Sequence, residues 1–574
     1  MYTRQDVLEA ADAGTLLETI AATPYQQLET ATGMLSELHN RGDIDFLAYC
    51  KPQPLAAVCD HSFFAIQRVF CDTLPHIVCS SEAAASACEH VFARAGNDGT
   101  AGLVYGSLTQ WFRQSPARAE EGLALIHHDP EIHRRLVRPV LLAGTTHDAD
   151  RYVEEAFNLS SDARSHVRLD ALWALGQIVS TEDEGVLTRT FDHLDKIMQA
   201  PVSDHDTAVV VEAAVTLLHR SEGRSAHLVE PLLQEACRHR TPDTRYALAN
   251  GLLLHRRHLT ETMIDAAFSA LRHMNRHDIH AANAIDSILY QWDLDSDRTR
   301  IFEFLANLLT QEDDPLDLET LSDFRHQLRG QPGNVLGWYV VSLLLTGEPA
   351  LCAAAERLLP YKETRQGLDI DLDTFSLTPP SLLYLARKIL GYCILNKECT
   401  AALLLSCLRT VTEQDREELE ELVFFHLCLN YLTAIDWFDT AIADSDRAKQ
   451  SVARISSRVR AYVAELERHG TCPAFKPNDR EGRLQGYRRA DFQRGVLKKA
   501  EQGSVLWSLA DKATILYGTS SIAYAYTDTG SEPHRQEVTM RAYEHFFEFP
   551  RLDIIDPVGF QWHIRLFRSE SPPS

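Results

Sequence analysis

Residues 161–178, Ser-Asp-Ala-Arg-Ser-His-Val-Arg-Leu-Asp-Ala-Leu-Trp-Ala-Leu-Gly-Gln-Ile, decide the fold of this chain. Apolar residues recur along this stretch with the period of one helical face: Val167, Ala171, Ala174, Leu175 and Ile178. Three more apolar side chains widen that face beyond what a surface helix needs: Leu169, Leu172 and Trp173. The pattern therefore predicts a helix that is covered by two neighbouring elements, with Trp173 buried between adjacent repeats.

The same pattern returns along the chain at steps of about 34 to 43 residues, a spacing typical of two-helix repeats. The counterparts of Ala171 are Ala214, Leu248 and Ala284. Companion helices are expected between these copies, at residues 187–199, 226–238 and 261–273. The order of an acidic cap, Val-Arg, Ala and Ala-Leu-Gly resembles the second helix of a HEAT repeat. This resemblance covers about residues 130 to 310 and implies an architecture without implying a reaction.

The fold class predicted from these patterns is mainly α: an α-solenoid of HEAT-like helix pairs with a small C-terminal antiparallel β segment. The β segment is expected because apolar and polar residues alternate near the C-terminus, as in Phe560, Trp562, Ile564 and Leu566. Five parts are expected. The N-terminal helical region at 1–125 either caps the array or forms a separate domain, and it is followed by HEAT-like repeats at 126–310 and further helix pairs at 311–445. Basic helices and a linker follow at 446–512, and a small β-rich segment with a disordered end at 513–574.

The composition is that of an ordinary soluble protein, with 45% hydrophobic and 24% charged residues in a chain of 574. The longest apolar run, residues 335–345, is too short to cross a bilayer, which takes about 20 residues. The first ten residues lack the apolar core of an export signal. We therefore expect no membrane contact and a cytoplasmic location.

The charge of the chain is strongly uneven. The formal net charge is −25, which argues against the whole body being a sleeve for nucleic acid. Residues 447–499, however, hold fourteen Lys or Arg against five Asp or Glu, about +9, so the remainder carries about −34. This basic tract is the most localised candidate for binding an acidic partner.

Arginines and lysines are interleaved with aromatic residues in the second half of the basic tract, a mixture suited to phosphates, stacked bases or acidic protein. The candidate contact residues are Arg480, Arg483, Tyr487, Arg488, Arg489, Phe492, Arg494, Lys498 and Lys499. The tract has a competing use, since it can dock on acids of the same chain such as Glu420 and Glu421. Docking within the chain or on a protein partner is favoured over nucleic acid.

Histidine–aspartate pairs raise the alternative of a metal-dependent phosphohydrolase of the HD type. The pairs begin at His128, His147, His205 and His277, and the densest cluster is His128, Asp129 and His133. Each Asp stands where a helix is expected to start, so helix capping explains it without a metal. The motifs of common metal, phosphate and serine-hydrolase sites do not occur, and the cysteines near the N-terminus form no CxxC pair. No metal, cofactor or catalytic residue is predicted.

The sequence as a whole favours a non-enzymatic, cytoplasmic scaffold or adaptor that binds another protein through its helical-repeat surface. A first alternative is a nucleic-acid-associated repeat protein that binds through residues 447–499. The HD-type phosphohydrolase is the second alternative.

Overall fold

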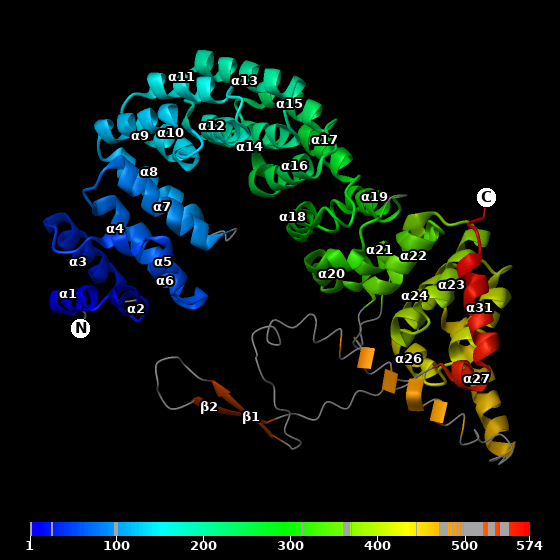
Figure 1. Ribbon diagram of the computed structural model, residues 1–574. Helices are drawn as coiled ribbons and strands as arrows, with labels where there is room; N and C mark the ends of the chain where they lie inside the picture. Colours follow the sequence, from blue (N-terminus) through cyan, green and yellow to red (C-terminus); the bar gives the residue numbers. More distant parts are fainter. Residues whose placement is uncertain are drawn as a thin grey trace. The chain divides into compact units, whose positions relative to one another are not determined.

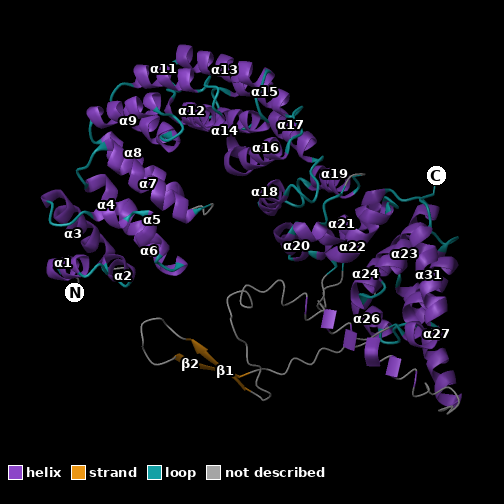
Figure 2. Cartoon of the chain, viewed as in Figure 1, coloured by secondary structure: helices purple, strands orange, loops and turns teal. Residues whose placement is uncertain are grey.

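The computed structural model shows a chain built almost entirely of helices, which divides into two compact units, Met1–Gly330 and Gln331–Ser574 (Figures 1 and 2). The structure describes residues 3–573 except for 25–26, 97–100, 312–313, 360–367, 369, 444, 470–479, 481–482, 485, 489, 492–493, 496–497, 499–519, 526–533 and 540–549.

The first unit is helical throughout its described length. Its elements are α1 Arg4–Asp12, α2 Leu16–Ala21, α3 Leu28–Arg41, α4 Phe46–Tyr49, α5 Pro52–Ala56, α6 Asp60–Thr73, η2 Leu74–His76, α7 Ser81–Ala95, α8 Ala101–Arg113, α9 Pro116–His128, η3 Arg134–Leu136, α10 Val137–Gly144, α11 Ala149–Leu159, α12 Ser165–Ile178, α13 Glu184–Gln199, α14 Asp204–Arg220, α15 Ala226–Ala236, α16 Pro242–His255, η4 Arg256–His258, α17 Glu261–Leu271, α18 Ile279–Tyr290, α19 Arg298–Leu309, η5 Leu318–Thr320 and α20 Ser322–Arg329.

From α8 to α18 these helices stack in two rows (Figure 1). The first row is formed by α8, α10, α12, α14, α16 and α18, each packed against the next. The helices α11, α13, α15 and α17 form a second row, and α11, α13 and α15 alternate in sequence with the first-row helices on which they pack. A stack in which each helix pair covers its neighbours is a helical-repeat solenoid.

The residues that mark the repeat in the sequence lie in the first row and are buried. Ala171, Ala214, Leu248 and Ala284 belong to α12, α14, α16 and α18 in turn. Gly176 shows how closely these helices approach, because a Cβ atom placed there would lie 2.8 Å from the Cα atom of Ala213 in α14. The small residues of the pattern therefore set the spacing between consecutive repeats.

A buried ion pair joins α12 to α14. Nε of Arg168 donates to Oδ1 of Asp206 at 3.1 Å, and the two side chains are 5% and 0% exposed. Both side chains have further partners: Nη1 of Arg168 donates to the carbonyl of Asp162 at 2.9 Å, and Oδ2 of Asp206 accepts from the amides of Val202 and Ser203. Because these partners compensate the desolvation of both charges, the pair can exist in the interior.

A second buried ion pair joins α16 to α18. Arg245 donates to Asp278 at 2.9 Å, and it also donates to the carbonyl of Arg240, just before its own helix. Asp278 in turn accepts from the amide of Asn275 at 2.9 Å. Each buried arginine thus binds a carbonyl in the loop before its own helix and an aspartate at the start of the next first-row helix.

The second unit is also mainly helical. Its elements are α21 Gly333–Leu345, α22 Pro349–Leu358, η6 Leu372–Phe375, α23 Pro379–Cys393, α24 Lys397–Thr410, α25 Arg416–Leu422, the π-helical turn η7 Val423–Cys428, α26 Ala434–Ala441, α27 Lys449–His469, the antiparallel strands β1 Ser520–Ala525 and β2 His534–Thr539, α30 Arg551–Ile555 and α31 Pro557–Ser569.

The C-terminal helix α31 packs on α23, which belongs to the middle of this unit (red and yellow-green in Figure 1). Phe560 and Phe567 are its buried residues. Nζ of the fully buried Lys388 donates to the carbonyl of Arg568 at 2.7 Å, and Arg387 holds Glu570 with two hydrogen bonds of 2.8 and 2.7 Å. The last helix is therefore an integral part of the core of the second unit.

The predicted small C-terminal antiparallel β segment is wrong for the end of the chain, where the expected strand through Phe560 to Leu566 is a helix. Apart from the pair β1 and β2, the described residues that follow α27 are helical wherever they form regular structure, and the alternating residues Phe560 to Leu566 lie in α31. Pro557 occupies the first turn of that helix, and Oδ1 of Asp556 caps it by accepting from the amide of Gly559 at 3.0 Å. The seven-residue spacing of Phe560 and Phe567 then defines one helical face, and the alternation is incidental.

Candidate functional site

Partly or largely exposed aromatic and charged side chains lie on consecutive first-row helices, and we call this set the first-row face. It crosses six consecutive first-row helices, and its members are Tyr105, Arg138, Asp170, Trp173, Glu212, Tyr246 and His280. None of these residues belonged to the candidate site predicted from the sequence.

Arg138 of α10 connects the first three helices of this face. Its guanidinium lies 4.7 Å from the centre of the Trp173 ring and 5.9 Å from that of Tyr105, both within cation–π range. Its Nε also donates to Oδ1 of Asp170 at 2.6 Å. Burial raises the pKa of the Asp170 carboxyl, and Arg138 acts against that rise. The cluster is thus ordered while its aromatic surface stays partly accessible.

The face continues beyond Trp173 with a carboxyl group and a second aromatic contact. Burial raises the pKa of Glu212 in α14, and the charge of Arg138 opposes the shift. Tyr246 of α16 is 41% exposed, and its ring meets that of His280 in α18 at 5.9 Å between centres. Tyr, Trp and Arg are the side chains most enriched in the energetic centres of protein interfaces.

Trp173 is half-buried, although the sequence pattern predicted a side chain buried between adjacent repeats. Its neighbour Leu172 is fully buried and occupies the position between the helices. An apolar stripe as broad as that of α12 does not indicate which edge faces the neighbouring helices. Trp173 lies at the open edge and is covered on one side by Arg138.

The first half of the basic tract is docked on acids of the same chain. From α27, Arg454 binds Glu420 through hydrogen bonds of 3.0 and 2.5 Å, and Arg458 binds Glu421 at 2.5 Å. Arg460 pairs with Asp439 at 2.8 Å. These glutamates belong to the acidic helix that the sequence offered as a docking site for the tract. A large share of the excess positive charge is therefore neutralised within the second unit.

The second half of the tract has a different environment. Six of the candidate contact residues are exposed there: Arg480, Arg483, Tyr487, Arg488, Arg494 and Lys498. Arg494 lies 4.0 Å from Asp491 on its own helical turn. Arg489, Phe492 and Lys499 lie outside the described residues. The structure thus brings Arg488 to the surface, and Arg488 also lines a hollow beside α31.

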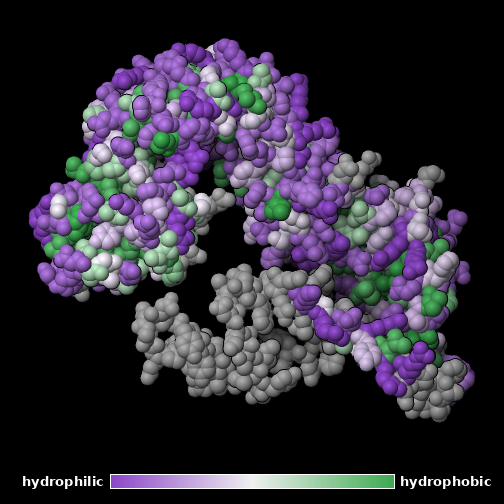
Figure 3. Space-filling view, in the orientation of Figure 1, coloured by the Kyte–Doolittle hydropathy of each residue, from purple (hydrophilic) through white to green (hydrophobic). Residues whose placement is uncertain are grey.

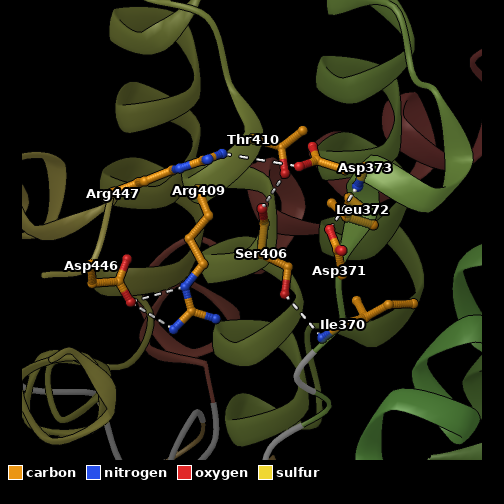
Figure 4. A pocket seen from close by; sticks show the side chains of 9 residues that line it. All are labelled: Ile370, Asp371, Leu372, Asp373, Ser406, Arg409, Thr410, Asp446 and Arg447. Carbon is orange, nitrogen blue, oxygen red and sulfur yellow. Dashed lines mark hydrogen bonds and ion pairs between the residues drawn. The ribbon is translucent and has the colours of Figure 1, made fainter.

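A recess of about 350 Å³ lies between η6, the end of α24 and the segment that precedes α27 (Figure 4). Its charged groups pair largely with one another: Arg409 binds Asp446 at 2.7 Å, and Arg447 lies 4.0 Å from Asp373. Asp371 accepts from the amide of Asp373 at 3.0 Å and so caps η6. With three carboxylates facing two guanidiniums, the recess favours neither an anion nor a metal cation.

The aspartates of the His–Asp pairs are engaged with the backbone. Asp148 caps α11 by accepting from the amide of Arg151, and Asp129 accepts from the amides of Glu131 and Ile132. Asp206 and Asp278 hold the buried arginines described above. Within the described part of the chain, no group of three or more His, Cys, Asp or Glu side chains could hold a metal ion. The geometry therefore gives no support to the HD-type site at His128, Asp129 and His133.

Comparison with known proteins adds little. No family model matches the chain, and no curated protein matches it. One similar solved structure is a circular tandem repeat protein with novel repeat topology and enhanced subunit contact surfaces, at 16% identity over 81% of this chain and 100% of that chain, with a TM-score of 0.14. The repeat architecture is accordingly established by the packing of α8 to α18. No helix among the described residues is long and apolar enough to span a membrane.

Proposed function

We propose that the protein is a non-enzymatic scaffold whose first-row face binds another protein. The observation that carries this proposal is the line of Tyr, Arg and Trp side chains that crosses consecutive repeats without being buried by the second row. Helical-repeat proteins expose extended surfaces of this kind, and aromatic and arginine side chains supply most of the binding energy at such surfaces.

The proposal includes the closer assignment of the repeats as HEAT-like and the cytoplasmic location expected from the sequence. The HEAT-like assignment is supported by the Val167-Arg168 pair of α12, whose arginine reaches the next repeat. Cysteines that are buried and free of disulfides, such as Cys50, Cys88 and Cys407, suit a reducing compartment.

The test is affinity purification of the tagged full-length protein from its own cells, followed by quantitative mass spectrometry. The double variant Trp173→Ala, Tyr246→Ala should lose its principal partner by roughly tenfold or more, because it removes two aromatic contacts from the centre of the face. Both side chains are partly exposed, so the variant should remain folded, which a thermal melt will check.

The matched control is Gln234→Ala, which changes an exposed residue of the second-row helix α15. The control should recover the same partners as the native protein. Unchanged recovery of every partner by the folded double variant would contradict the assignment of the first-row face.

A further inference from the structure

The outer side of α31 exposes large apolar residues along one stripe, which we call the α31 stripe. Val558, Trp562 and Leu566 are 80%, 67% and 53% exposed, and Ile555 at the end of α30 is 66% exposed. Spacings of four residues place Val558, Trp562 and Leu566 on one side of α31, and Ile555 stands just before that helix. Figure 3 shows hydrophobic surface along this edge of the second unit.

The exposure of the stripe does not mean that α31 is loosely attached, because the helix is firmly packed on α23. The opposite side of the helix buries Phe560 and Phe567, and Lys388 binds the carbonyl of Arg568 at its C-terminal end. Nε of Arg568 donates to the carbonyl of Gly391 at 2.7 Å, which ties the same turn to α23. The apolar stripe is therefore held on a fixed support, and a ligand would not have to order it on binding.

A hollow of about 690 Å³ lies beside the stripe, and basic groups dominate its charge. Two guanidiniums line it against a single carboxylate, while Val558 and Trp562 supply apolar surface. The lining residues are Arg488, Asp553, Pro557, Val558, Gly559, Gln561, Trp562 and Arg565. Arg488 comes from the second half of the basic tract, which joins that tract to the α31 stripe in one surface.

We propose that the α31 stripe and its hollow dock an amphipathic helix of a partner protein that carries carboxylates beside its apolar face. The stripe matches the apolar anchors of such a helix, which recur at spacings of three, four and seven residues. Arg488 and Arg565 then face the carboxylates of the partner. This charge complementarity sets the register of the helix and selects against basic partners.

Two other occupants fit the observations less well. A nucleic acid would use the arginines and stack on Trp562, but it gains little from the aliphatic Val558 and Leu566, and the whole chain carries a net charge of −25. A second copy of the chain would place Arg488 and Arg565 of both copies at one interface, where like charges repel.

The experiment measures fluorescence anisotropy of a labelled synthetic helix binding to the full-length protein. The probe peptide, called the Glu peptide, has Leu at every third or fourth position and Glu on both flanks. A comparison peptide, called the Lys peptide, has Lys in place of every Glu. The native protein should bind the Glu peptide at least roughly tenfold more tightly than the Lys peptide. Trp562→Ala should weaken binding of the Glu peptide by roughly tenfold or more.

A charge reversal gives a second, independent readout. Arg565→Glu should weaken binding of the Glu peptide and strengthen binding of the Lys peptide, which general loss of structure cannot do. Leu254→Ala and Arg238→Glu change an exposed apolar and an exposed basic residue of the first unit, and both should bind the Glu peptide as the native protein does. Because these variants leave the first-row face intact, this test is independent of the proposed function.

Any of four results would overturn the inference. The first two are equal affinity for the Glu and Lys peptides and unchanged binding of the Glu peptide by Trp562→Ala. The third is binding of a labelled single-stranded oligonucleotide that Trp562→Ala abolishes, with no binding of the Glu peptide, which would assign the surface to nucleic acid. The fourth is a dimer in sedimentation equilibrium that Trp562→Ala dissociates, which would assign the surface to a second copy.

Discussion

Arg168 and Asp206 show how a single residue pair connects two repeats. Both side chains are almost fully buried, and each is also bonded to backbone groups of the loops at the start of α12 and α14. Replacing Arg168 leaves a buried carboxylate whose partner is missing. Such a pair contributes little net stability while it is intact, but losing one member costs about 3 to 5 kcal/mol.

Arg168→Met is therefore expected to lower the free energy of unfolding by about 3 to 5 kcal/mol, measured by urea denaturation. The matched control is Arg189→Met, because Arg189 and Glu154 form an ion pair at 2.5 Å whose side chains are 53% and 56% exposed. Exposed pairs contribute about 0 to 1 kcal/mol, so the control should unfold nearly as the native protein does. An equal decrease of the free energy of unfolding in both variants would show that burial of the ion pair does not determine the decrease.

At the scale of the element, the contact between η7 and α31 is expected to depend on pH. The rings of His426 and His563 lie 5.1 Å apart, and Phe567 packs on His426 at 4.9 Å. Burial, aided by His563, lowers the pKa of His426 to about 4 from an ordinary value near 6.5. As the pH falls from about 6.5 to about 4, the unfolded chain takes up a proton at this position and the folded protein does not, so folded stability declines through that window.

The expected loss from His426 is at most about 3.5 kcal/mol, since one pKa unit corresponds to about 1.4 kcal/mol. The measurement compares urea denaturation of the native protein and of His426→Gln from pH 7 to pH 4.5. Other histidines titrate in both proteins, so the informative quantity is the difference between the two curves. That difference should shift in favour of the variant as the pH falls, and parallel curves would contradict the prediction.

Helix α31 shows why part of the fold could not be predicted from the sequence. Phe560, Trp562, Ile564 and Leu566 alternate with polar residues, which is a strand pattern, yet they form α31. The decisive local signal is Asp556-Pro557, which caps and begins the helix. Outward Trp562 and Leu566 looked like core residues because a sequence does not distinguish apolar side chains that bury from those that remain exposed.

The repeats themselves were predictable because Ala171 and its counterparts are apolar and buried where first-row helices touch. The first-row face was not predictable, since its members stand at positions where the helix packing imposes no pattern. Tyr246 and Trp173 belong to different repeats and come onto neighbouring helices of one row only after α12 to α16 are stacked. The docking of Arg454 on Glu420, in contrast, follows from charge alone, and the sequence already favoured docking of the tract on such acids.

At the scale of the whole molecule, the two units can be tested as independent folding bodies. Each has its own buried core, and the division falls after Gly330. In a repeat array, stability is set by the neighbours of each repeat, so a fragment that retains its neighbours should keep its fold. Residues 1–330 and 331–574, expressed separately, are each expected to show a cooperative thermal transition by circular dichroism.

The decisive comparison is between fragments 331–574 and 331–549, because the shorter one lacks α30 and α31. Without α31, the apolar side of α23 loses its cover, and the fully buried Lys388 loses the carbonyl of Arg568. An uncovered apolar helix face no longer contributes its burial to stability, and it promotes aggregation. Fragment 331–549 should therefore aggregate in size-exclusion chromatography or melt at a clearly lower temperature than 331–574. If the two fragments behaved alike, α31 would be an accessory helix, and the rigid support that the α31 stripe requires would be lacking.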